Sequence, residues 1–343
     1  MKRFKSAKEI RVAVIGYGPA FGMGRHHLRE MADAGMTPTA VVDTDRERVQ
    51  AARSDFPGIE TYTSAAAMLR KSPANLVTVI TPHNTHARLA LQCLQAGRHV
   101  VCEKPFAVTT AECDAMIAEA RRRKLVLSTY HNRHWDGCIL QALKEIRRRR
   151  IGDVYRVTAW SGRFGKPQDW WRSSRSRSGG VLYDWGVHLL EYALQVIASE
   201  IVEVSGFEKT GVWARHTAWK EDTNEDEATA VVRFRNGTRL TLTASHLDLN
   251  PRPSTLEFTG TKGTYLMSGD HYEILTRADD TTVRVTGPNP PSEGWRFYRN
   301  IADHMVKGVA LVITPEWARR PIQILDLAAR SAKKGRTLRA KYP

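Results

Sequence analysis

The sequence predicts an α/β protein in two parts: an N-terminal doubly wound parallel sheet, and a C-terminal α+β domain with a large, mostly antiparallel open sheet. Three observations lead to this prediction. The chain has 343 residues, which exceeds one ordinary hydrophobic core and suits two. Through the first 130 residues, short apolar runs alternate with helical periodicity. Afterwards, β-rich runs mostly follow one another without helices between them. We therefore expect one domain over residues 1–130 and a second over residues 131–343.

The first half is expected to form a parallel sheet that helices cover on both faces. Its strand candidates are short apolar runs, rich in β-branched residues, as in strands buried on both sides. They span residues 10–15, 39–42, 76–80, 99–102 and 125–128. Segments with helical periodicity separate them, near residues 24–34, 45–54, 65–70, 85–96 and 111–123. This alternation is typical of successive β-α-β units.

The second half begins with a helix near residues 136–149 and then changes in texture. Its strand candidates span residues 154–160, 201–207, 228–235, 239–246, 255–259 and 264–267. Asn236-Gly237 predicts a two-residue hairpin, because both residues tolerate positive φ. Further helices are expected at residues 182–197, 296–307 and 315–333. Pro321 should break or kink the last of them.

Composition excludes several classes of protein. Hydrophobic residues make up 42% and charged residues 26% of the chain, as in globular rather than disordered proteins. No apolar run approaches the roughly 18–20 residues that cross a bilayer. The basic start is followed by charged Lys8, Glu9 and Arg11 where an apolar signal core would have to lie, so we expect a cytoplasmic protein without membrane partners. The four cysteines form no C-x-x-C pair, which indicates buried free thiols rather than a zinc ribbon or a disulfide framework.

The net charge of +16 raises the question of a polyanionic partner. Basic runs at residues 121–124 and 147–150 stand at the ends of predicted helices, where cations favour the negative helix terminus. No nucleic-acid-binding motif accompanies them. We expect solvated surface charge and no nucleic-acid partner; retention on DNA that depends on salt is the test of the alternative.

A glycine-rich loop follows the first predicted strand. It contains Gly16, Gly18, Gly22 and Gly24 and leads into a helix. Backbone N–H groups and the positive helix end hold a dinucleotide pyrophosphate at such a place, which requires residues without an obstructing Cβ. The strict G-x-G-x-x-G spacing would put the third glycine at Phe21, so Gly24 fills that role only in a loop three residues longer.

The second predicted strand ends in an acid, as a dinucleotide site requires. Asp43 lies 27 residues after Gly16, against a usual spacing of about 20. A carboxylate there accepts hydrogen bonds from ribose hydroxyls and repels a 2′-phosphate, which favours NAD. Arg46 is close enough in sequence to reach a 2′-phosphate, so NADP stays open; a helix-capping role for Asp43 is the other interpretation.

By these and later motifs the chain resembles the Gfo/Idh/MocA family, the glucose–fructose oxidoreductase and inositol dehydrogenase group. The resemblance runs from about residue 10 to residue 190 and returns near the C-terminus. Five motifs carry it: Gly24-x-x-His27, Thr81-Pro82-x-Asn84-x-His86, the run 96–105 that ends in Glu103-Lys104-Pro105, Thr109-x-x-Glu112, and the run 179–188 that contains Asp184-Trp185-Gly186-Val187-His188. The bulky Tyr183 and Trp185 depart from the commonest family form.

The resemblance implies a Rossmann dinucleotide-binding domain and a second domain whose open sheet supports a homodimer or homotetramer. It implies a hydride exchanged with a hydroxyl or carbonyl of a sugar, cyclitol or sugar acid. Lys104 would contact substrate and nicotinamide ribose, and Asp184 and His188 would transfer the proton. The implied cofactor-binding residues are Gly16, Gly18, Gly22, Gly24, Asp43, Thr81, Pro82, Asn84, His86, Glu103 and Lys104.

The residues support this chemistry on their own terms. Asp184 and His188 are four residues apart in a predicted helix and hence on one face. Oxidation of a carbinol requires removal of the hydroxyl proton, and an imidazole does this near neutral pH. Lys104 can stabilise the developing alkoxide. A surface ion pair is the alternative for the Asp/His pair alone.

Aromatic and basic side chains suggest where a substrate binds. Polar groups on an aromatic base suit a polyol ring, although packing in the core explains each tryptophan about as well. The candidates for substrate binding are Arg133, His134, Trp135, Trp171 and Arg172, together with Lys104, Asp184 and His188. One of the three arginines at positions 172, 175 and 177 is a candidate for binding a substrate carboxylate or phosphate; a solvated loop is the alternative.

A metal site is not expected. His131-x-x-His134 and His83-x-x-His86 have ligand-like spacing, but no third ligand accompanies either pair.

Two rival functions remain open. The same residues would serve a lyase or glycoside-cleaving enzyme that uses NAD transiently, in which case no NADH would accumulate. A dinucleotide-sensing regulator could lack the proton-transfer residues, so the presence of Lys104, Asp184 and His188 argues against it.

Overall fold

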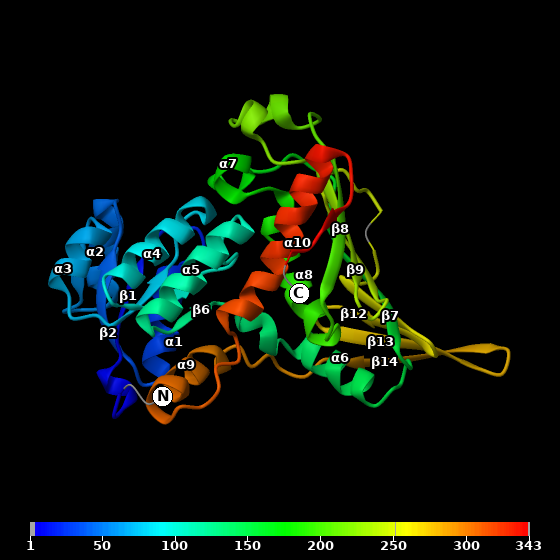
Figure 1. Ribbon diagram of the computed structural model, residues 1–343, viewed down its shortest axis with the longest axis horizontal. Helices are drawn as coiled ribbons and strands as arrows, with labels where there is room; N and C mark the ends of the chain where they lie inside the picture. The colour runs from blue at the N-terminus through cyan, green and yellow to red at the C-terminus, as the bar shows by residue number, and fades with distance from the viewer. Residues whose placement is uncertain (1–3, 251, 342–343) are drawn as a thin grey trace. The chain divides into compact units, whose positions relative to one another are not determined.

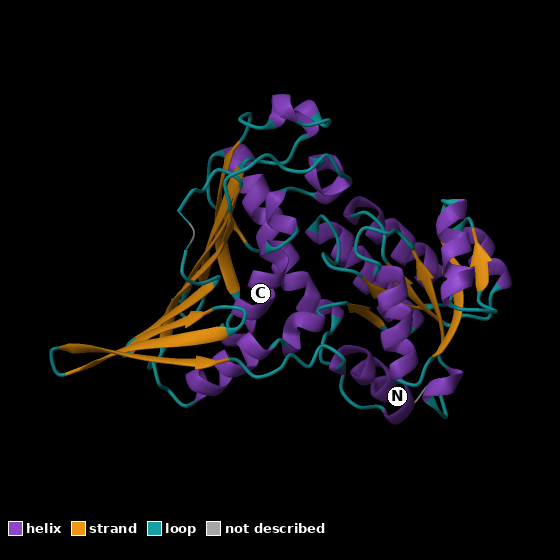
Figure 2. Ribbon diagram, turned by 180° about the vertical axis from the view of Figure 1, so that it is seen from behind, coloured by secondary structure: helices purple, strands orange, loops and turns teal. Residues whose placement is uncertain are grey.

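The computed structural model describes residues 4–250 and 252–341, and its chain forms two compact units (Figures 1 and 2). The first comprises the chain up to Asn132 together with Trp295–Arg319; the second comprises Arg133–Gly294 and the chain from Arg320 onward. A late segment thus packs with the first unit. The boundary between independently folding domains at residue 130 stays a prediction.

The first unit is built on a six-stranded parallel sheet in the order β3-β2-β1-β4-β5-β6. Its strands are β1 (Arg11–Ile15), β2 (Thr37–Val42), β3 (Glu60–Tyr62), β4 (Leu76–Val79), β5 (His99–Cys102) and β6 (Leu127–Thr129). Every residue of β4 and β5 is buried, so both faces of the sheet are covered. This confirms the predicted Rossmann-type fold. β3 was not predicted, because its three half-buried residues form no apolar run.

The helices of this unit agree closely with the prediction. They are α1 (Met23–Asp33), α2 (Arg46–Asp55), α3 (Ala65–Lys71), α4 (His86–Gln95), α5 (Thr110–Arg123) and α9 (Arg296–Lys307). Side chains fix several starts: Asp45 caps α2, and Thr109 and Glu112 form a reciprocal capping box at α5.

The second unit contains a nine-stranded sheet in the order β14-β13-β12-β11-β7-β10-β9-β8-β15. Its strands are β7 (Val154–Gly162), β8 (Ile201–Lys209), β9 (Glu227–Phe234), β10 (Arg239–Ser245), β11 (Leu256–Gly260), β12 (Gly263–Met267), β13 (His271–Ala278), β14 (Thr281–Pro288) and β15 (Leu338–Arg339). Only β7 and β10 pair in parallel, which confirms a mostly antiparallel sheet. The β13–β14 hairpin was missed, because nearly all of β14 is exposed and polar residues interrupt its valines.

The hairpin prediction is right in place and wrong in detail. Four residues, 235–238, join β9 and β10, and the Phe234 N–H donates to the Thr238 carbonyl across the turn. Only Gly237 has positive φ, at 86°. The Gly237 N–H donates to the Phe234 carbonyl, so a tight turn is followed by one left-handed glycine rather than the two-residue connection that Asn236-Gly237 predicts.

The helices that belong wholly or partly to this unit are α6 (Gly137–Arg147), α7 (Arg175–Ser178), α8 (Gly186–Val196) and α10 (Pro315–Lys334). The predicted break at Pro321 is wrong, since α10 runs through it. Buried apolar residues on either side of the proline, Ala318 and Ile322 among them, hold the helix in place. The predicted helix over 182–197 is also corrected: a 3₁₀ turn, η5 (Val181–Tyr183), precedes α8, which starts only at Gly186.

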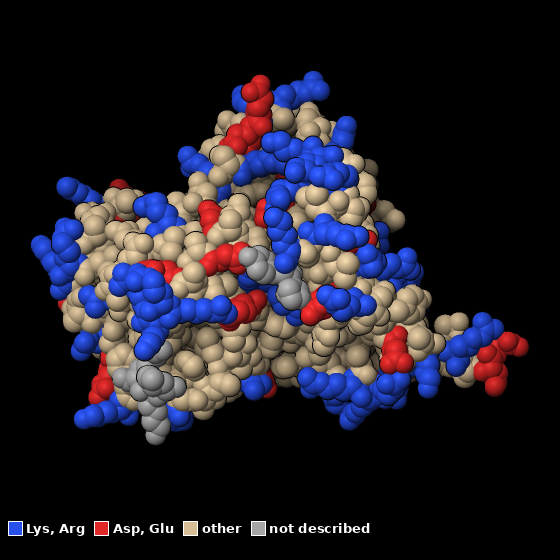
Figure 3. Space-filling view, viewed as in Figure 1, with Lys and Arg blue, Asp and Glu red and all other residues tan. Residues whose placement is uncertain are grey.

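Surface and core features complete the description. All four cysteines are free and buried, as predicted. Among the described residues, no helix has the length and apolar character to span a bilayer. Basic side chains are spread over the face in Figure 3. The two basic runs lie at the ends of α5 and α6, where they pair with neighbouring acids such as Glu119 and Glu145.

Gly206 of β8 is a position where the fold tolerates no side chain. A Cβ there would lie 1.9 Å from the Ala328 carbonyl oxygen of α10. We expect Gly206→Ala to destabilise the protein by about 1–3 kcal/mol through overpacking. Gly269→Ala, where a Cβ meets nothing within 4 Å, is the matched control. Thermal unfolding of both variants is the measurement, and equal melting temperatures would show that β8 and α10 are not packed this closely.

Candidate active site

The glycine turn after β1 is shaped by two close approaches of the backbone. Gly16 has φ of 107°, and a Cβ there would lie 2.3 Å from the Ile80 carbonyl oxygen. A Cβ on Gly24 would lie 2.8 Å from the Gly16 carbonyl oxygen and 2.6 Å from the Tyr17 ring. Gly24 therefore allows α1 to pack closely on the turn, which is the role of the third glycine in a dinucleotide-binding loop.

The other two glycines face open space. A Cβ on Gly18 or Gly22 would meet no atom within 4 Å. Gly22 precedes α1 with φ of 57°. Phe21, in the longer loop, is 59% exposed, so its ring is not folded into the turn. The turn thus leaves room at the N-terminal end of a helix, where a pyrophosphate binds in Rossmann folds; the residues present fit a dinucleotide.

Asp43, directly after β2, is tied to this turn. Its carboxylate accepts the Tyr17 N–H at 2.7 Å and the Asp45 N–H at 2.9 Å. The Tyr17 hydroxyl donates to Asp55 at 2.7 Å, which secures the same loop from α2. Asp43 is thus held at the turn, half-buried, in the position expected for an acid that contacts ribose.

The turn after β4 holds four of the predicted cofactor residues, and they differ in exposure. Asn84 is exposed, and Thr81 and Pro82 are half-buried. His86 is fully buried, with Nδ1 2.8 Å from the Pro105 carbonyl oxygen and Nε2 2.8 Å from the Thr81 carbonyl oxygen. Burial lowers the pKa of His86. Its ring joins two loops of the site, and its contact with a cofactor stays a prediction.

The turn after β5 places Glu103 and Lys104. Glu103 accepts His27 Nε2–H at 3.1 Å and the Lys104 N–H at 2.7 Å. Burial alone would raise the pKa of Glu103, but the hydrogen bond from His27 and the charge and backbone N–H of Lys104 lower it below its ordinary value. The Glu103 carboxylate therefore holds the Lys104 backbone in place. Glu103 thus holds the loop that carries Lys104, and its contact with a cofactor stays a prediction.

In the second unit, Asp184 is paired with an arginine. Arg172 Nη1 donates to the Asp184 carboxylate, and the guanidinium lies 5.2 Å from the ring centroids of both Trp170 and Trp171. The tryptophans thus frame Arg172, which in turn holds Asp184. Asp184 lies before α8 rather than in it, because the first helical bonds run from the His188 and Leu189 N–H groups to the Trp185 carbonyl. The expectation of one continuous helix through Asp184 and His188 is wrong.

His188 lies in the first turn of α8 and is 6% exposed. Its ring centroid is 5.6 Å from that of Trp185, which is 48% exposed. The Arg133 guanidinium lies 5.0 Å from the Trp185 ring and donates to Asp136 at 2.9 Å. Trp185, which lies between Asp184 and His188 in sequence, is thus an exposed aromatic side chain in contact with a cation. The sequence analysis noted only that Trp185 is bulky.

Two more of the predicted substrate-binding residues, His134 and Trp135, follow the sixth strand. His134 Nδ1 lies 2.5 Å from the buried Glu191 carboxylate of α8. Trp135 is 5% exposed. Both rings are thus placed by the fold, and their contact with a substrate stays a prediction.

The arginine-rich loop is held by acids that sequence analysis missed. Arg175 pairs with Glu208 at 2.8 Å and Glu225 at 3.3 Å, and the Arg177 guanidinium lies 4.9 Å from the Trp219 ring. Glu225 also accepts the Val181 N–H at 2.9 Å. No local motif marks these partners, because Glu208 lies 33 residues after Arg175 and Glu225 lies 44 residues after Val181.

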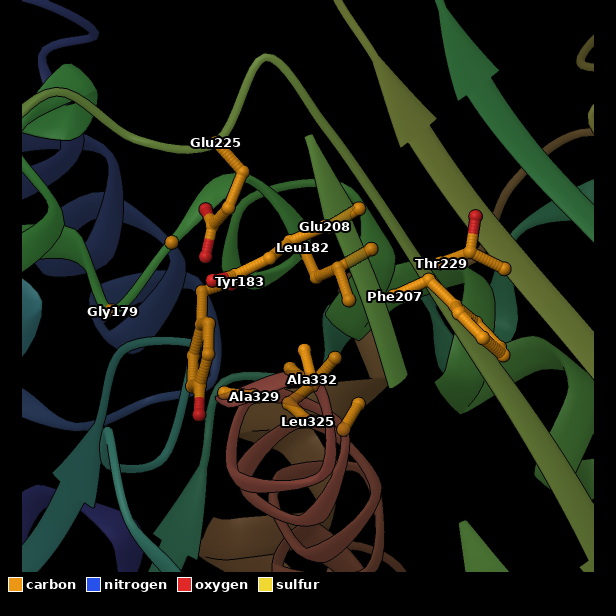
Figure 4. Close-up of a pocket in the computed structure, with 13 residues that line it drawn as sticks. Gly179, Leu182, Tyr183, Phe207, Glu208, Glu225, Thr229, Leu325, Ala329 and Ala332 are labelled. Carbon is orange, nitrogen blue, oxygen red and sulfur yellow. The ribbon is translucent and has the colours of Figure 1, made fainter. Parts of the chain in front are cut away.

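A pocket lies behind this loop, between residues 179–183, β8, β9 and α10. Figure 4 shows Tyr183 and Glu225 on one side and Phe207 on the other, with Leu325 and two alanines of α10 below. Its lining includes neither Asp184 nor His188. We assign it no part in the chemistry.

No metal centre is found in the described part of the chain: residues 4–250 and 252–341 hold no group of three or more His, Cys, Asp or Glu side chains that would bind a metal ion.

Comparison with known proteins agrees with this geometry. A family model described as Gfo/Idh/MocA oxidoreductase family, NAD-binding Rossmann fold, matches residues 10–131. The Gfo/Idh/MocA C-terminal domain model matches residues 139–266. The two matches together cover more than half of the chain and confirm the resemblance that the motifs carry.

Individual relatives span nearly the whole chain. The scyllo-inositol 2-dehydrogenase (NADP⁺) IolW of Bacillus subtilis is 25% identical, and the alignment covers 100% of this chain and 99% of that protein. The D-apiose dehydrogenase of Paraburkholderia graminis is 28% identical, and the alignment covers 98% of this chain and 91% of that protein. A solved NAD-binding protein from Listeria innocua has a TM-score of 0.81 and 26% identity, with 97% of each chain covered.

The open space at Gly18 yields a direct test. We expect Gly18→Val to weaken NADH binding by at least about tenfold, because its side chain enters the space left for the pyrophosphate. Since no atom lies within 4 Å of the added Cβ, the melting temperature should not change. Titration of nicotinamide fluorescence gives the affinity, and Gly269→Val serves as the control. Unchanged NADH affinity in Gly18→Val would place the dinucleotide elsewhere.

Proposed function

The chain belongs to the Gfo/Idh/MocA oxidoreductase family, and we propose that it transfers a hydride between NAD(P) and a hydroxyl or carbonyl group of a sugar, cyclitol or sugar-acid-like substrate. Family membership confirms the predicted class of NAD(P)-dependent oxidoreductase acting on CH–OH groups. The individual substrate and the role of each residue are our proposals. Its relatives include proteins named scyllo-inositol and D-apiose dehydrogenases, which supports a polyhydroxylated small molecule.

One observation supports the proposal most strongly. In the turn after β1, two glycines pack tightly against the backbone, and two others border empty space in which a dinucleotide could bind. Gly16 and Gly24 have no room for a Cβ, whereas Gly18 and Gly22 have open space beside them. Asp43 is fixed next to this turn and favours NAD. The exposed Arg46, three residues further on, can bind the 2′-phosphate of NADP. When bound, the nicotinamide ring supplies the hydride acceptor or donor.

Lys104 is the proposed electrophilic group. Its backbone is fixed by Glu103 at the carboxyl end of β5, the edge of a parallel sheet where ligands bind. An ammonium group there stabilises negative charge that develops on the substrate oxygen during hydride transfer.

His188 is the proposed proton acceptor, and Asp184 acts beside it. An imidazole removes the hydroxyl proton during oxidation and returns it during reduction. Because Asp184 is ion-paired with Arg172, it is held as a carboxylate and suits orientation of the substrate or of the imidazolium better than donation of a proton.

The partners of the arginines favour an uncharged substrate. Arg172, Arg175 and Arg177 each already contact an acid or an aromatic ring of the chain. A substrate carboxylate would have to compete with these contacts. We therefore propose a neutral ring polyol that packs against the exposed part of Trp185, whose ring suits the C–H face of such a ring.

The assembly and location of the protein are further proposals. The burial pattern of β9 alternates, and Val231 is 36% exposed, as on a sheet with one open face. We propose a homodimer or homotetramer through this sheet, in the cytoplasm.

Substitution of the two proposed groups tests the mechanism. We expect Lys104→Ala and His188→Ala to retain dinucleotide affinity within about threefold and to lose about 10²–10⁴ in kcat. Purified protein is incubated with NAD or NADP and a panel of sugars, uronic acids and inositols while reduced nicotinamide is followed by absorbance. His271→Ala, on an exposed strand end, is the control. Full turnover in Lys104→Ala or His188→Ala would remove that residue from the mechanism. Substrate consumption without NADH accumulation would favour the lyase alternative.

The role of Arg172 is tested on a matched pair of substrates, a uronic acid and the corresponding neutral sugar. We expect Arg172→Met to lower kcat for the neutral sugar by about tenfold or more, because Asp184 loses a charged hydrogen-bond donor. Arg175→Met and Arg177→Met should leave its KM unchanged. A large rise in KM confined to the uronic acid, in any of the three variants, would instead identify a subsite for an acidic group.

A further inference from the structure

We propose that Tyr298 and His27 are positioning residues that act on Lys104 through a buried chain of hydrogen bonds. The inference rests on the proposed function, in which Lys104 works at the reacting centre. It adds a residue from α9, near the end of the chain, that no sequence motif indicates.

The chain of contacts lies entirely within the first unit. Tyr298 Oη is 2.7 Å from His27 Nδ1, and His27 Nε2 is 3.1 Å from Glu103 Oε1. The other carboxylate oxygen, Glu103 Oε2, accepts the Lys104 N–H at 2.7 Å. At the far end, Tyr298 Oη is 3.2 Å from Thr78 Oγ1 of β4. Four side chains thus link α9 and the sheet to the backbone of the proposed catalytic lysine.

Burial makes these contacts specific. His27 and Thr78 are 0% exposed and Tyr298 is 1% exposed, so no water replaces a missing partner at little cost. The Tyr130 ring lies 4.2 Å from the His27 ring, but its hydroxyl donates to Glu30 and does not compete for either imidazole nitrogen. Tyr298 therefore supplies the hydrogen bond to Nδ1.

The direction of the bonds follows from Glu103. Its pKa is lowered, so it is a carboxylate and only accepts, and His27 must present Nε2–H to it. In a neutral ring, Nδ1 is then an acceptor and needs a donor. Burial keeps the pKa of Tyr298 well above its ordinary value, so the phenol retains its proton and donates it to Nδ1. Tyr298 thereby selects the tautomer of His27 that holds Glu103.

Removal of the Tyr298 hydroxyl alone should loosen this arrangement. A phenylalanine fills the same space beside Phe297 and Tyr130, but Nδ1 loses its donor. The imidazole can then place its proton on Nδ1, which turns a lone pair toward the Glu103 carboxylate. Glu103 is left with one fewer hydrogen bond, and the Lys104 loop is less well fixed.

The first experiment compares Tyr298→Phe with Tyr265→Phe in the full-length protein. Tyr265 is also buried, and its hydroxyl has no hydrogen-bond partner in the described chain. We expect Tyr298→Phe to lower kcat about five- to tenfold, the effect of one lost buried hydrogen bond, with unchanged NADH affinity and substrate KM. Tyr265→Phe should match the parent. A kcat for Tyr298→Phe equal to that of Tyr265→Phe would overturn the inference, as would a loss of NADH affinity that accounts for the whole effect.

The second experiment asks whether Tyr298 acts through His27. The amide of His27→Gln can still donate to Glu103, whereas His27→Leu cannot, so we expect Gln to retain much more turnover than Leu. In the Gln variant there is no tautomer to select, and adding Tyr298→Phe should lower kcat less than twofold further. Fully additive effects, or equal losses in Gln and Leu, would contradict a path through His27.

The two proposals fail in different ways. If the parent protein produces no reduced nicotinamide with any substrate of the panel, the proposed function itself fails, whereas full turnover in Lys104→Ala would remove only Lys104 and the positioning chain that acts on it. Loss of turnover in Lys104→Ala, combined with normal kcat in Tyr298→Phe, would leave the function standing and reject only the positioning chain.

Discussion

The half-buried carboxylate of Glu103 makes the hydrogen bonds on which the loop after β5 depends. It accepts one hydrogen bond from His27 of α1 and one from the Lys104 backbone, so it joins a helix to the end of β5. A buried charge is stable only when it is paired and hydrogen-bonded. The fold meets this requirement with neighbours that also define the site, and the loop after β5 is therefore built rigid before any ligand arrives.

In each unit, neighbouring side chains fix the proposed catalytic groups by the same physical means. In the first, the glycine turn and Lys104 follow β1 and β5, which end at the same edge of a parallel sheet. In the second, Arg172 is framed by two tryptophans and holds Asp184, while Arg133 braces Trp185 next to His188. Charged groups held in fixed positions need little rearrangement during a reaction, which is the basis of electrostatic catalysis.

The sequence predicts whatever depends on local pattern and misses what depends on distant partners. The strands of the parallel sheet are apolar runs, and Gly24 was identified as the third glycine despite the longer loop. The break before α8 was missed because Asp184 is held by Arg172 and the helix starts only at Gly186, which no periodicity shows. The hydrogen bonds of His86 and Glu103 within the fold were not predicted, because a motif names residues without saying which way their side chains point. Tyr298 was invisible, since its partner His27 lies 271 residues away.

The central proposal is that Lys104 and His188 both take part in hydride transfer with a dinucleotide seated on the glycine turn. A crystal structure with NAD(H) and a bound polyol measures this directly. The account predicts pyrophosphate against Gly18 and Gly22, with Lys104 Nζ and a His188 ring nitrogen both within about 2.6–3.2 Å of the same substrate oxygen. The account would be contradicted if Lys104 and His188 did not contact the same bound substrate, or if the dinucleotide bound away from the turn.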